Sequence, residues 1–165
     1  MNINTSNIDS LLTKLKSSTN LKEFAQLFLW TLAKELEASQ GAFFITKVKQ
    51  EVKVLSFVIG YAYNIAESET VEFEFGEGLS GQVAKEGKLI NINTVPEGYI
   101  TILSGLGQAT PTSIIIFPLK KDDEVIAVLE LASFKKIEKD EEDFILELSS
   151  KVEMLIGNLI LDNQG

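Results

Sequence analysis

The spacing of apolar residues along this chain switches between a helical and a strand-like period. Residues 8–15 and 21–36 carry apolar side chains at steps of three and four, which is typical of helices with one buried face. Asn20 followed by Glu23 resembles a capping box, in which the acid three residues after the N-cap bonds back to the N-cap backbone. We predict two N-terminal helices, the second of which ends near Gly41, because glycine is common just after helix C-termini.

The middle of the chain mostly alternates apolar and polar residues, which is the period of half-buried strands. A short helix over residues 79–86 interrupts the strands and ends at Gly87. Glycine and proline punctuate the irregular segment 94–111, where we expect one helical turn around Tyr99–Leu103. Because hairpins join most strands, the pattern predicts an α+β domain. The predicted strands are 42–48, 51–63, 71–75, 89–93, 112–120 and 124–134.

The last apolar pattern predicts a long helix that begins in the acidic stretch EKDEED and runs to about Leu161. Its apolar residues form two faces. One face can lie on the sheet, whereas the other needs a partner, such as the first helix and its copy in a second chain. We therefore expect a homodimer, with the alternative that one monomer buries both faces. The first face comprises Ile145, Leu148, Val152, Leu155 and Leu159, and the second Leu146, Met154, Ile160 and Leu161.

The spacing Gly76-x-Gly78-x-x-Gly81 also occurs in loops that bind dinucleotides. Those loops follow an apolar parallel strand and open a crossover of roughly a dozen residues or more. Here the preceding VEFEF alternates, and only a short helix separates the loop from the next strand. We interpret the glycines as structural: Gly76 and Gly78 permit unusual backbone angles, and Gly81 permits close packing.

Composition removes most catalytic chemistry from consideration. The 165 residues include no Cys and no His, and all fifteen basic residues are Lys. Cysteine nucleophiles, thiolate and imidazole metal sites, and the usual general base near neutral pH are therefore absent from this chain. We expect no enzymatic activity, metal or cofactor. The alternative is a small enzyme that uses Glu, Lys, Ser or Tyr chemistry.

Charge and hydropathy limit the partners and the location that we expect. The net charge of −9 repels nucleic acid and anionic lipid surfaces. No apolar run approaches the roughly 20 residues that a membrane-spanning helix needs, and the polar start MNINTSNIDS lacks the plan of a signal peptide. We expect a cytoplasmic chain that contacts neither nucleic acid nor membrane.

Three segments carry a resemblance to a known family. GEGLSGQVAKEGKLININTVP (76–96), IIIFPLKKDDEVIAVLELASF (114–134) and the acid-capped last helix are similar to the GAF domain family. The resemblance covers about residues 20 to 160. The phrases GYITILSGLG (98–107) and AVLELASF (127–134) most resemble GAF domains of bacterial signalling proteins, such as sensor kinases and chemoreceptor-like proteins.

The resemblance implies a specific form of the α+β fold. It implies a six-stranded antiparallel sheet with the first and last helices on one face. On the other face, a short helix and a loop would close over a small-molecule pocket. The implied domain plan is an N-terminal helical extension at 1–19, a GAF-like domain at 20–161 and a C-terminal tail at 162–165.

The resemblance also implies a function. Most members are sensory or regulatory modules that bind a small molecule and pass a helix movement to an output domain, here expected to be of the kinase or chemoreceptor type. Bilin-binding and methionine-sulfoxide-reducing members use cysteines, and members that bind cyclic nucleotides carry an Asn-Lys signature. This chain has neither feature. A purely structural dimerisation module without a ligand is the alternative.

Candidate ligand contacts gather around the irregular segment 94–111, because irregular connections on rigid scaffolds carry binding groups. Tyr99, Thr101 and Ser104 would supply hydroxyl groups there. Tyr61 and Phe73 would form part of an apolar wall, although strand aromatics more often belong to the core.

Glu130 is the most distinctive candidate for a ligand contact, because it lies in an otherwise apolar strand. We predict that it shares a strand face with Ile126, Val128, Ala132 and Phe134. Its carboxyl group then either contacts a ligand or accepts backbone N–H groups as a structural cap. Asn91 and Asn93 lie on one face of their own strand, where they contact a ligand or form a solvated edge.

Overall fold

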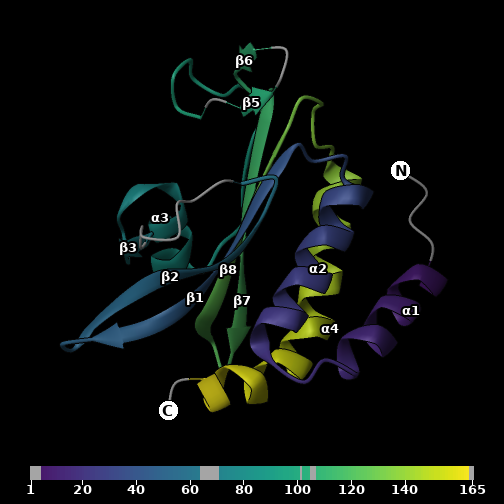
Figure 1. Ribbon diagram of the computed structural model, residues 1–165, viewed down its shortest axis with the longest axis vertical. Coiled ribbons are helices and arrows are strands. Elements are labelled where there is room, and N and C mark those ends of the chain that lie inside the picture. Colours follow the sequence, from purple (N-terminus) through teal and green to yellow (C-terminus); the bar gives the residue numbers. More distant parts are fainter. Residues whose placement is uncertain (1–4, 64–70, 101, 105–106, 164–165) are drawn as a thin grey trace.

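The computed structural model describes residues 5–63, 71–100, 102–104 and 107–163. A central sheet separates two layers, with α1, α2 and α4 on one face and α3 on the other (Figure 1). Within these ranges, no helix is both long and apolar enough to cross a membrane. The helices are α1 (Thr5–Lys16), α2 (Leu21–Glu35), α3 (Gly78–Glu86) and α4 (Lys139–Asn163).

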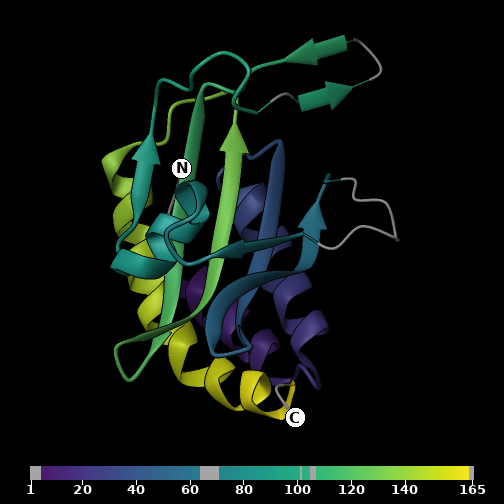
Figure 2. The same ribbon diagram turned by 90° about the vertical axis from the view of Figure 1, so that its left-hand side faces the viewer.

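Six strands form the sheet in the order β3-β2-β1-β8-β7-β4, and each neighbouring pair is antiparallel. This arrangement confirms the predicted α+β class and the six-stranded antiparallel sheet. The strands are β1 (Gln40–Lys49), β2 (Val52–Tyr61), β3 (Glu72–Glu74), β4 (Ile90–Ile92), β7 (Ser113–Lys121) and β8 (Glu124–Ser133). A separate pair, β5 (Ile102–Ser104) and β6 (Gly107–Ala109), projects beyond one end of the sheet (Figure 2).

Helix α2 begins as predicted and ends earlier than predicted. The Asn20 side-chain oxygen accepts the Glu23 backbone N–H at 2.9 Å, which is a normal N-cap. The helix ends at Glu35, because Glu37 adopts a left-handed φ of 52° and turns the chain toward the sheet. Gly41 lies inside β1 instead, where a Cβ atom would come within 2.7 Å of the Leu131 side chain. Its small size serves strand packing rather than helix termination.

The two long hairpins turn on residue pairs with positive φ. Gln50 and Glu51 have φ of 50° and 67°, and Asp122 and Asp123 have φ of 52° and 64°. Such pairs form the tight turns whose twist matches antiparallel strands. Both turns lie at junctions between consecutive predicted strands.

The predicted helical turn at Tyr99–Leu103 is wrong. A turn does occur, but it precedes that range: the Tyr99 N–H donates to the Pro96 carbonyl at 3.2 Å, and Gly98 supplies a φ of 84°. The chain then extends into β5, whose Ser104 pairs with Gly107 of β6. Glycine disfavours helix and suits short hairpin connections, so the glycines near residue 105 favour a hairpin over a helical turn.

Two β-bulges shift the alternation of side chains in the sheet. Phe43 pairs with Ile59 and Phe44 with Phe57, so β2 carries one extra residue, Val58. Leu119 pairs with Ala127 and Lys120 with Val125, so β8 carries one extra residue, Ile126. Beyond a bulge the face assignment of every residue reverses relative to strict alternation.

The sheet separates two hydrophobic cores. The larger core lies under α1, α2 and α4, and its sheet residues include Phe43, Phe117 and Leu129. The smaller core lies under α3 and includes Phe44 and Val128. Helix α1 belongs to the larger core through Ile8, Leu11 and Leu15, so the extension predicted at 1–19 packs on the domain; its boundary stays a prediction.

Helix α4 has the two faces that its sequence predicted. Ile145, Leu148 and Val152 are fully buried against the larger core, with Leu155 and Leu159 partly buried. On the second face, Leu146 is 48% exposed and Met154 is 85% exposed, so neither is buried within the monomer. The side chains of Ile160 and Leu161 lie outside the described part of the chain.

Candidate functional site

A cavity of about 470 Å³ lies on the α3 side of the sheet. Its floor comes from β1 and β8, its walls from β3 and α3, and one side from the turn that carries Tyr99. This size falls within the range of pockets that enclose small molecules. The lining residues are Gln40, Gly41, Ala42, Phe44, Tyr63, Phe73, Glu77, Gly78, Leu79, Ser80, Tyr99, Ile100, Glu130 and Ala132.

Glu130 places a carboxyl group on the floor of this cavity. Its strand neighbours are Ala42 of β1 and Ile116 of β7, so the surface around it is apolar. The Ser80 hydroxyl donates a hydrogen bond to Glu130 Oε2 at 2.8 Å. Burial raises the pKa of Glu130 above its ordinary value, and the bond from Ser80 opposes that rise. The carboxyl group can therefore be neutral or charged according to what else enters the cavity.

Ser80 reaches Glu130 because of the local structure of α3. It lies in the first turn of this helix and is almost fully buried. Gly81 lets α3 approach β3, since a Cβ atom there would come within 2.5 Å of the Glu74 carbonyl oxygen. Ser80 is not among the site residues predicted from the sequence. The sequence feature that could have identified it is its position directly before Gly81, a glycine at a point of close packing.

Tyr99 lies at the mouth of the cavity and is 45% exposed. Desolvation is the largest cause that raises its pKa, and the nearby charge of Glu130 is the second. A hydrogen bond with the backbone of Leu79 acts in the opposite direction. The phenol is therefore neutral near neutral pH and connects the turn at residues 96–99 to the start of α3.

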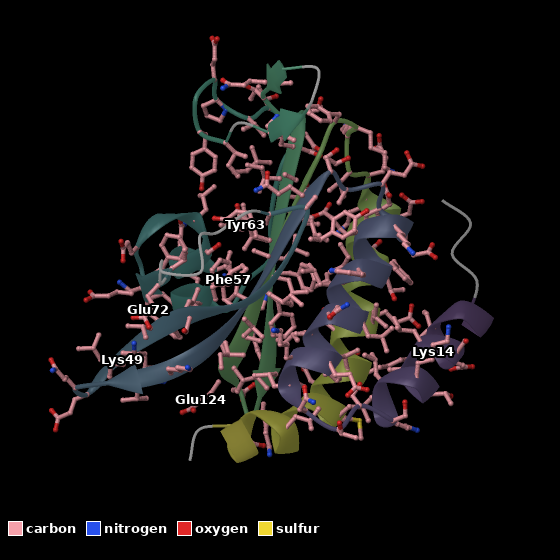
Figure 3. All side chains as sticks on the ribbon, viewed as in Figure 1. Lys14, Lys49, Phe57, Tyr63, Glu72 and Glu124 are labelled. Carbon is pink, nitrogen blue, oxygen red and sulfur yellow. The ribbon has the colours of Figure 1, made fainter. Side chains whose placement is uncertain are left out.

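Aromatic rings form the apolar wall. Phe44 packs edge-on against Phe57 and Phe73, with ring centroids 5.9 and 5.7 Å apart. Tyr63 stacks on Phe57 at 5.7 Å, and Figure 3 shows these two side chains together on the α3 side of β2. These contacts hold Phe44, Phe73 and Tyr63 around the cavity.

The family model described as GAF domain matches residues 18–156. This chain belongs to the GAF domain family. A search of curated proteins finds no match.

The fold of this GAF domain is similar to several solved structures. The GAF domain of an Acinetobacter phosphoenolpyruvate-protein phosphotransferase has a TM-score of 0.76 at 16% identity, with 96% of this chain and 95% of that chain covered. Free methionine-R-sulfoxide reductase of Neisseria meningitidis, solved with its substrate, has a TM-score of 0.69 at 18% identity, with 92% and 87% covered. A fragment of a methyl-accepting chemotaxis protein has a TM-score of 0.67 at 16% identity, with 92% and 97% covered. At these identities the likeness establishes the fold alone.

Only some of the predicted site residues line the cavity. Phe73, Tyr99 and Glu130 all line the cavity. Tyr61 does not, because the bulge at Val58 turns it to the helical side, where its ring meets Trp30 of α2 edge-on at 6.2 Å. Thr101 lies outside the described residues, and of Ser104 only the backbone in β5 is described.

Of the four residues predicted to share a strand face with Glu130, two do so and two do not. Val128 and Ala132 share its face in the smaller core. Ile126 packs on the larger core because it is the bulged residue of β8, and Phe134 lies beyond the strand, 48% exposed. Both departures follow from strand geometry that simple alternation does not contain.

The glycine motif serves the turn of this GAF domain. Gly76 and Gly78 have φ of 93° and 62°. The Gly76 N–H donates to the Gly81 carbonyl at 2.7 Å, and the Glu77 N–H donates to the Glu74 carbonyl at 2.9 Å. These donors are used within the loop, and β3 is antiparallel to β2. The geometry therefore matches the structural interpretation and lacks the parallel crossover of a dinucleotide site.

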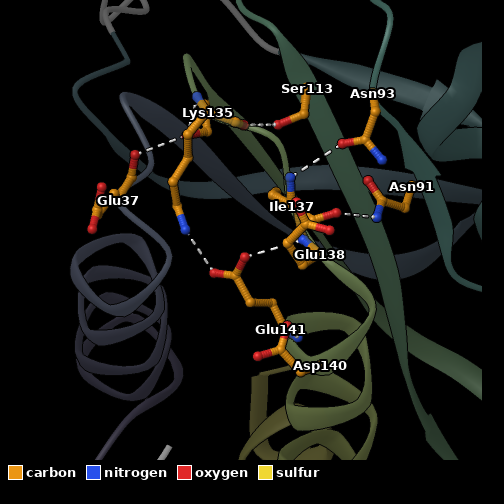
Figure 4. Close-up of polar contacts among 10 residues, drawn as sticks. Glu37, Asn91, Asn93, Ser113, Lys135, Ile137, Glu138, Asp140 and Glu141 are labelled. Atoms are coloured by element: carbon orange, nitrogen blue, oxygen red, sulfur yellow. Dashed lines mark hydrogen bonds and ion pairs between the residues drawn. The ribbon is translucent and has the colours of Figure 1, made fainter. Parts of the chain in front are cut away.

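Asn91 and Asn93 have a structural role. Asn91 donates to the Ile137 carbonyl at 3.0 Å, and Asn93 accepts the Ile137 N–H at 3.1 Å (Figure 4). The backbone carbonyl and the backbone N–H of Ile137, which lies just before α4, are thus each bound by one asparagine side chain. These bonds attach β4, on the edge of the sheet, to the start of the C-terminal helix.

Proposed function

We propose that this GAF domain is a non-enzymatic sensory module of a bacterial signalling protein, which binds a small molecule in the cavity around Glu130. The observation that carries the proposal is a carboxyl group on the floor of an aromatic cavity. An ionised carboxylate has about four acceptor sites, and Ser80 occupies one of them. A ligand donor there would satisfy a group that burial otherwise disfavours in its charged form.

The polar contacts around Ile137 support a route from the cavity side to α4. Strand β4 carries Ile90 on the cavity side of the sheet, and Asn91 of β4 and Asn93 just after it are hydrogen-bonded to Ile137. On either side of Ile137, polar contacts reach Glu141 in the first turn of α4: the Lys135 ammonium contacts Glu141 Oε2 at 2.8 Å, and Glu141 Oε1 accepts the Glu138 N–H at 3.1 Å (Figure 4). A ligand that shifts β4 would thus change the position of the first turn of α4.

The exposed face of α4 supports a homodimer or a contact with an output domain. Met154 and Leu146 expose apolar surface on the helix that would carry the signal. We propose that two copies pair through this face, with an output domain of the kinase or chemoreceptor type in the complete signalling protein. A purely structural dimerisation module would use the same face with an empty cavity.

An enzymatic role is disfavoured by the residues of this chain. The fold is similar to methionine-R-sulfoxide reductases, but the sequence has no Cys, the residue that the family resemblance implies for that reduction. A nucleophile also needs a base within hydrogen-bond reach. Ser80 has Glu130 as its hydrogen-bond partner, but the serine residue is almost fully buried. This geometry suits binding better than attack on a substrate.

A thermal-shift screen with metabolites tests the binding proposal. A ligand at about 100 times its dissociation constant stabilises the folded state by about 2.7 kcal/mol, which raises the melting temperature by roughly 5 to 10 °C. Ala132→Leu fills the floor beside Glu130 and should abolish the shift. Ala109→Leu makes the same change on exposed β6, outside the cavity, and should retain it. No shift across a broad library would favour the structural alternative.

A further inference from the structure

The charges that line the cavity limit the ligands that it accepts. Among the described lining residues, Glu77 and Glu130 carry carboxyl groups and none is a lysine. We propose that the cavity binds a small organic ammonium ion, with its charged nitrogen on Glu130 and its apolar part against the aromatic wall. This inference rests on the proposed binding function and adds the chemical class of the ligand.

Hydrogen-bonding capacity at the floor favours a ligand that only donates. Ser80 already donates to Glu130 Oε2, and an ionised carboxylate accepts further bonds but donates none. An ammonium group carries up to three donors and no acceptor, so it complements the remaining acceptor sites. Bonds between an ammonium and a carboxylate are also shorter and stronger than neutral bonds.

The wall suits the rest of such a ligand. Phe44 and Phe73 pack edge-on to each other, and Tyr63 and Leu79 complete an apolar lining beside Glu130. Aromatic faces attract cations when water is excluded, and they bury alkyl or aryl groups equally well. A ligand with one cationic end and one apolar end therefore finds both surfaces within a single cavity.

The first turn of α3 is the feature that would favour an anion, since helix N-termini attract negative charge. Two observations weigh against an anion here. Glu77 precedes the helix and places its own carboxylate at that end, where its Oε2 accepts the Glu74 N–H at 2.8 Å. The Leu79 backbone is hydrogen-bonded to Tyr99. A ligand carboxylate would also meet Glu130 across a short distance of low dielectric, which is strongly unfavourable.

The remaining competitor is a neutral ligand that accepts a hydrogen bond from protonated Glu130, and pH separates the two classes. Burial raises the pKa of Glu130. A cation binds the ionised form, so its affinity should increase as pH rises through that pKa, with release of a proton. A neutral acceptor should bind more weakly over the same interval.

Few other titratable groups face Glu130. Glu77 at the head of α3, Tyr63 and Tyr99 share the described lining. From the neighbouring strands, β1 contributes uncharged Gln40, and the β7 residue opposite is Ile116. The pKa of Tyr99 is raised, so its phenol stays neutral from about pH 5 to about pH 8.

The test uses two sets of probes with matched size and different charge. The first set is 2-phenylethylamine, 2-phenylethanol and 3-phenylpropionate, and the second is hexylamine, 1-hexanol and hexanoate. Binding is followed by backbone amide shifts at Ser80 and Ala132 from about pH 5 to about pH 8, and proton release by calorimetry in two buffers. The proteins are the wild type, Glu130→Gln, and the control Glu124→Gln at the exposed start of the same strand.

The proposal predicts that at least one amine binds more tightly than its alcohol and its carboxylate, and more tightly as pH rises. Glu130→Gln keeps an acceptor for Ser80 but removes the charge, so amine affinity should fall about ten- to a hundredfold. Glu124→Gln should bind as the wild type does.

Other outcomes overturn the proposal and separate it from the proposed function. If alcohols or carboxylates bind as tightly as the amines, or if Glu130→Gln binds amines normally, the ammonium assignment is wrong but the cavity still binds ligands. If none of the probes shifts Ser80 and Ala132, the ammonium assignment is also wrong. If the metabolite screen is silent as well, the binding function fails with it.

Discussion

The two faces of the sheet are built from alternate residues of the same strands, yet they have different properties. On the helical face, Phe43, Phe117 and Leu129 are fully buried under α2 and α4. On the opposite face, Phe44 and Ala132 line a cavity that contains the Glu130 carboxyl group. The helical face follows the rules of a close-packed interior. The cavity face departs from those rules at the positions where a binding function would use the departure.

The comparison is sharpest at two adjacent residues of β1. Phe43→Ala removes a ring from the closed core and should cost about 3–5 kcal/mol of unfolding free energy, because a new void is added to the lost burial. Phe44→Ala enlarges an existing cavity and should cost about 2–3 kcal/mol of unfolding free energy, close to the free energy of burying the ring alone. Urea denaturation measures both. An equal or larger loss at Phe44 would show that the cavity face is also closely packed.

The connection between the two faces can be broken at Asn93. Asn93→Ala leaves the N–H of buried Ile137 without its acceptor at 3.1 Å, which should cost about 1–3 kcal/mol. Asn93→Asp keeps an acceptor and serves as the control. Hydrogen exchange at the first turn of α4 should increase in the alanine variant only. If the alanine variant leaves that exchange unchanged, β4 does not position α4.

The loss of stability caused by a buried carboxyl group on the cavity face can be measured at Glu130. Its folded-state pKa is raised, so the native state binds more protons than the unfolded state between the ordinary and the raised pKa. Stability therefore falls as pH increases through that interval. Glu130→Gln should be more stable above the interval by about 1 kcal/mol, or about 2–4 °C in melting temperature.

The pH dependence provides the control for this variant. The stability difference should vanish below the ordinary pKa of a glutamate, where both side chains are neutral. Glu124→Gln, at an exposed position of the same strand (Figure 3), should show no comparable gain. A destabilised Glu130→Gln would mean that the charged form has a structural role.

The smallest effect on stability is expected at the exposed face of α4. Met154→Lys should change the unfolding free energy of the monomer by less than about 0.5 kcal/mol. It should nevertheless weaken the proposed dimer, which light scattering over a concentration series would detect. Gln50→Lys adds the same charge at the exposed β1–β2 turn and is the control. A wild type that is monomeric at every concentration would remove the dimer proposal.

Local patterns predicted most of the fold because most elements here obey local rules. The cap at Asn20, the turn at Asp122 and Asp123, and the short helix ending at Gly87 depend on neighbours in sequence. The errors in assigning residues to a face of the sheet arose where a strand carries one extra residue. The bulges at Val58 and Ile126 are set by pairing with other strands, which periodicity within one strand does not reveal.

The candidate site was predicted in part for the same reason. Glu130 and Phe73 stood out because a polar residue in an apolar strand and an inward aromatic are visible in one segment. Ser80 was missed because its role depends on how closely α3 approaches β3 and on which residue of β8 lies below it. Tyr61 was misplaced by the bulge at Val58.

Carbon-detected NMR titration of the Glu130 carboxyl group, free and with the tightest-binding amine, tests the central claim most directly. We predict that the pKa of Glu130 is raised in the free protein and moves downward when the amine is bound. A Glu130 pKa that is ordinary in the free protein, or that does not move on binding, would contradict the claim that the Glu130 carboxyl group receives an ammonium ligand on this face of the sheet.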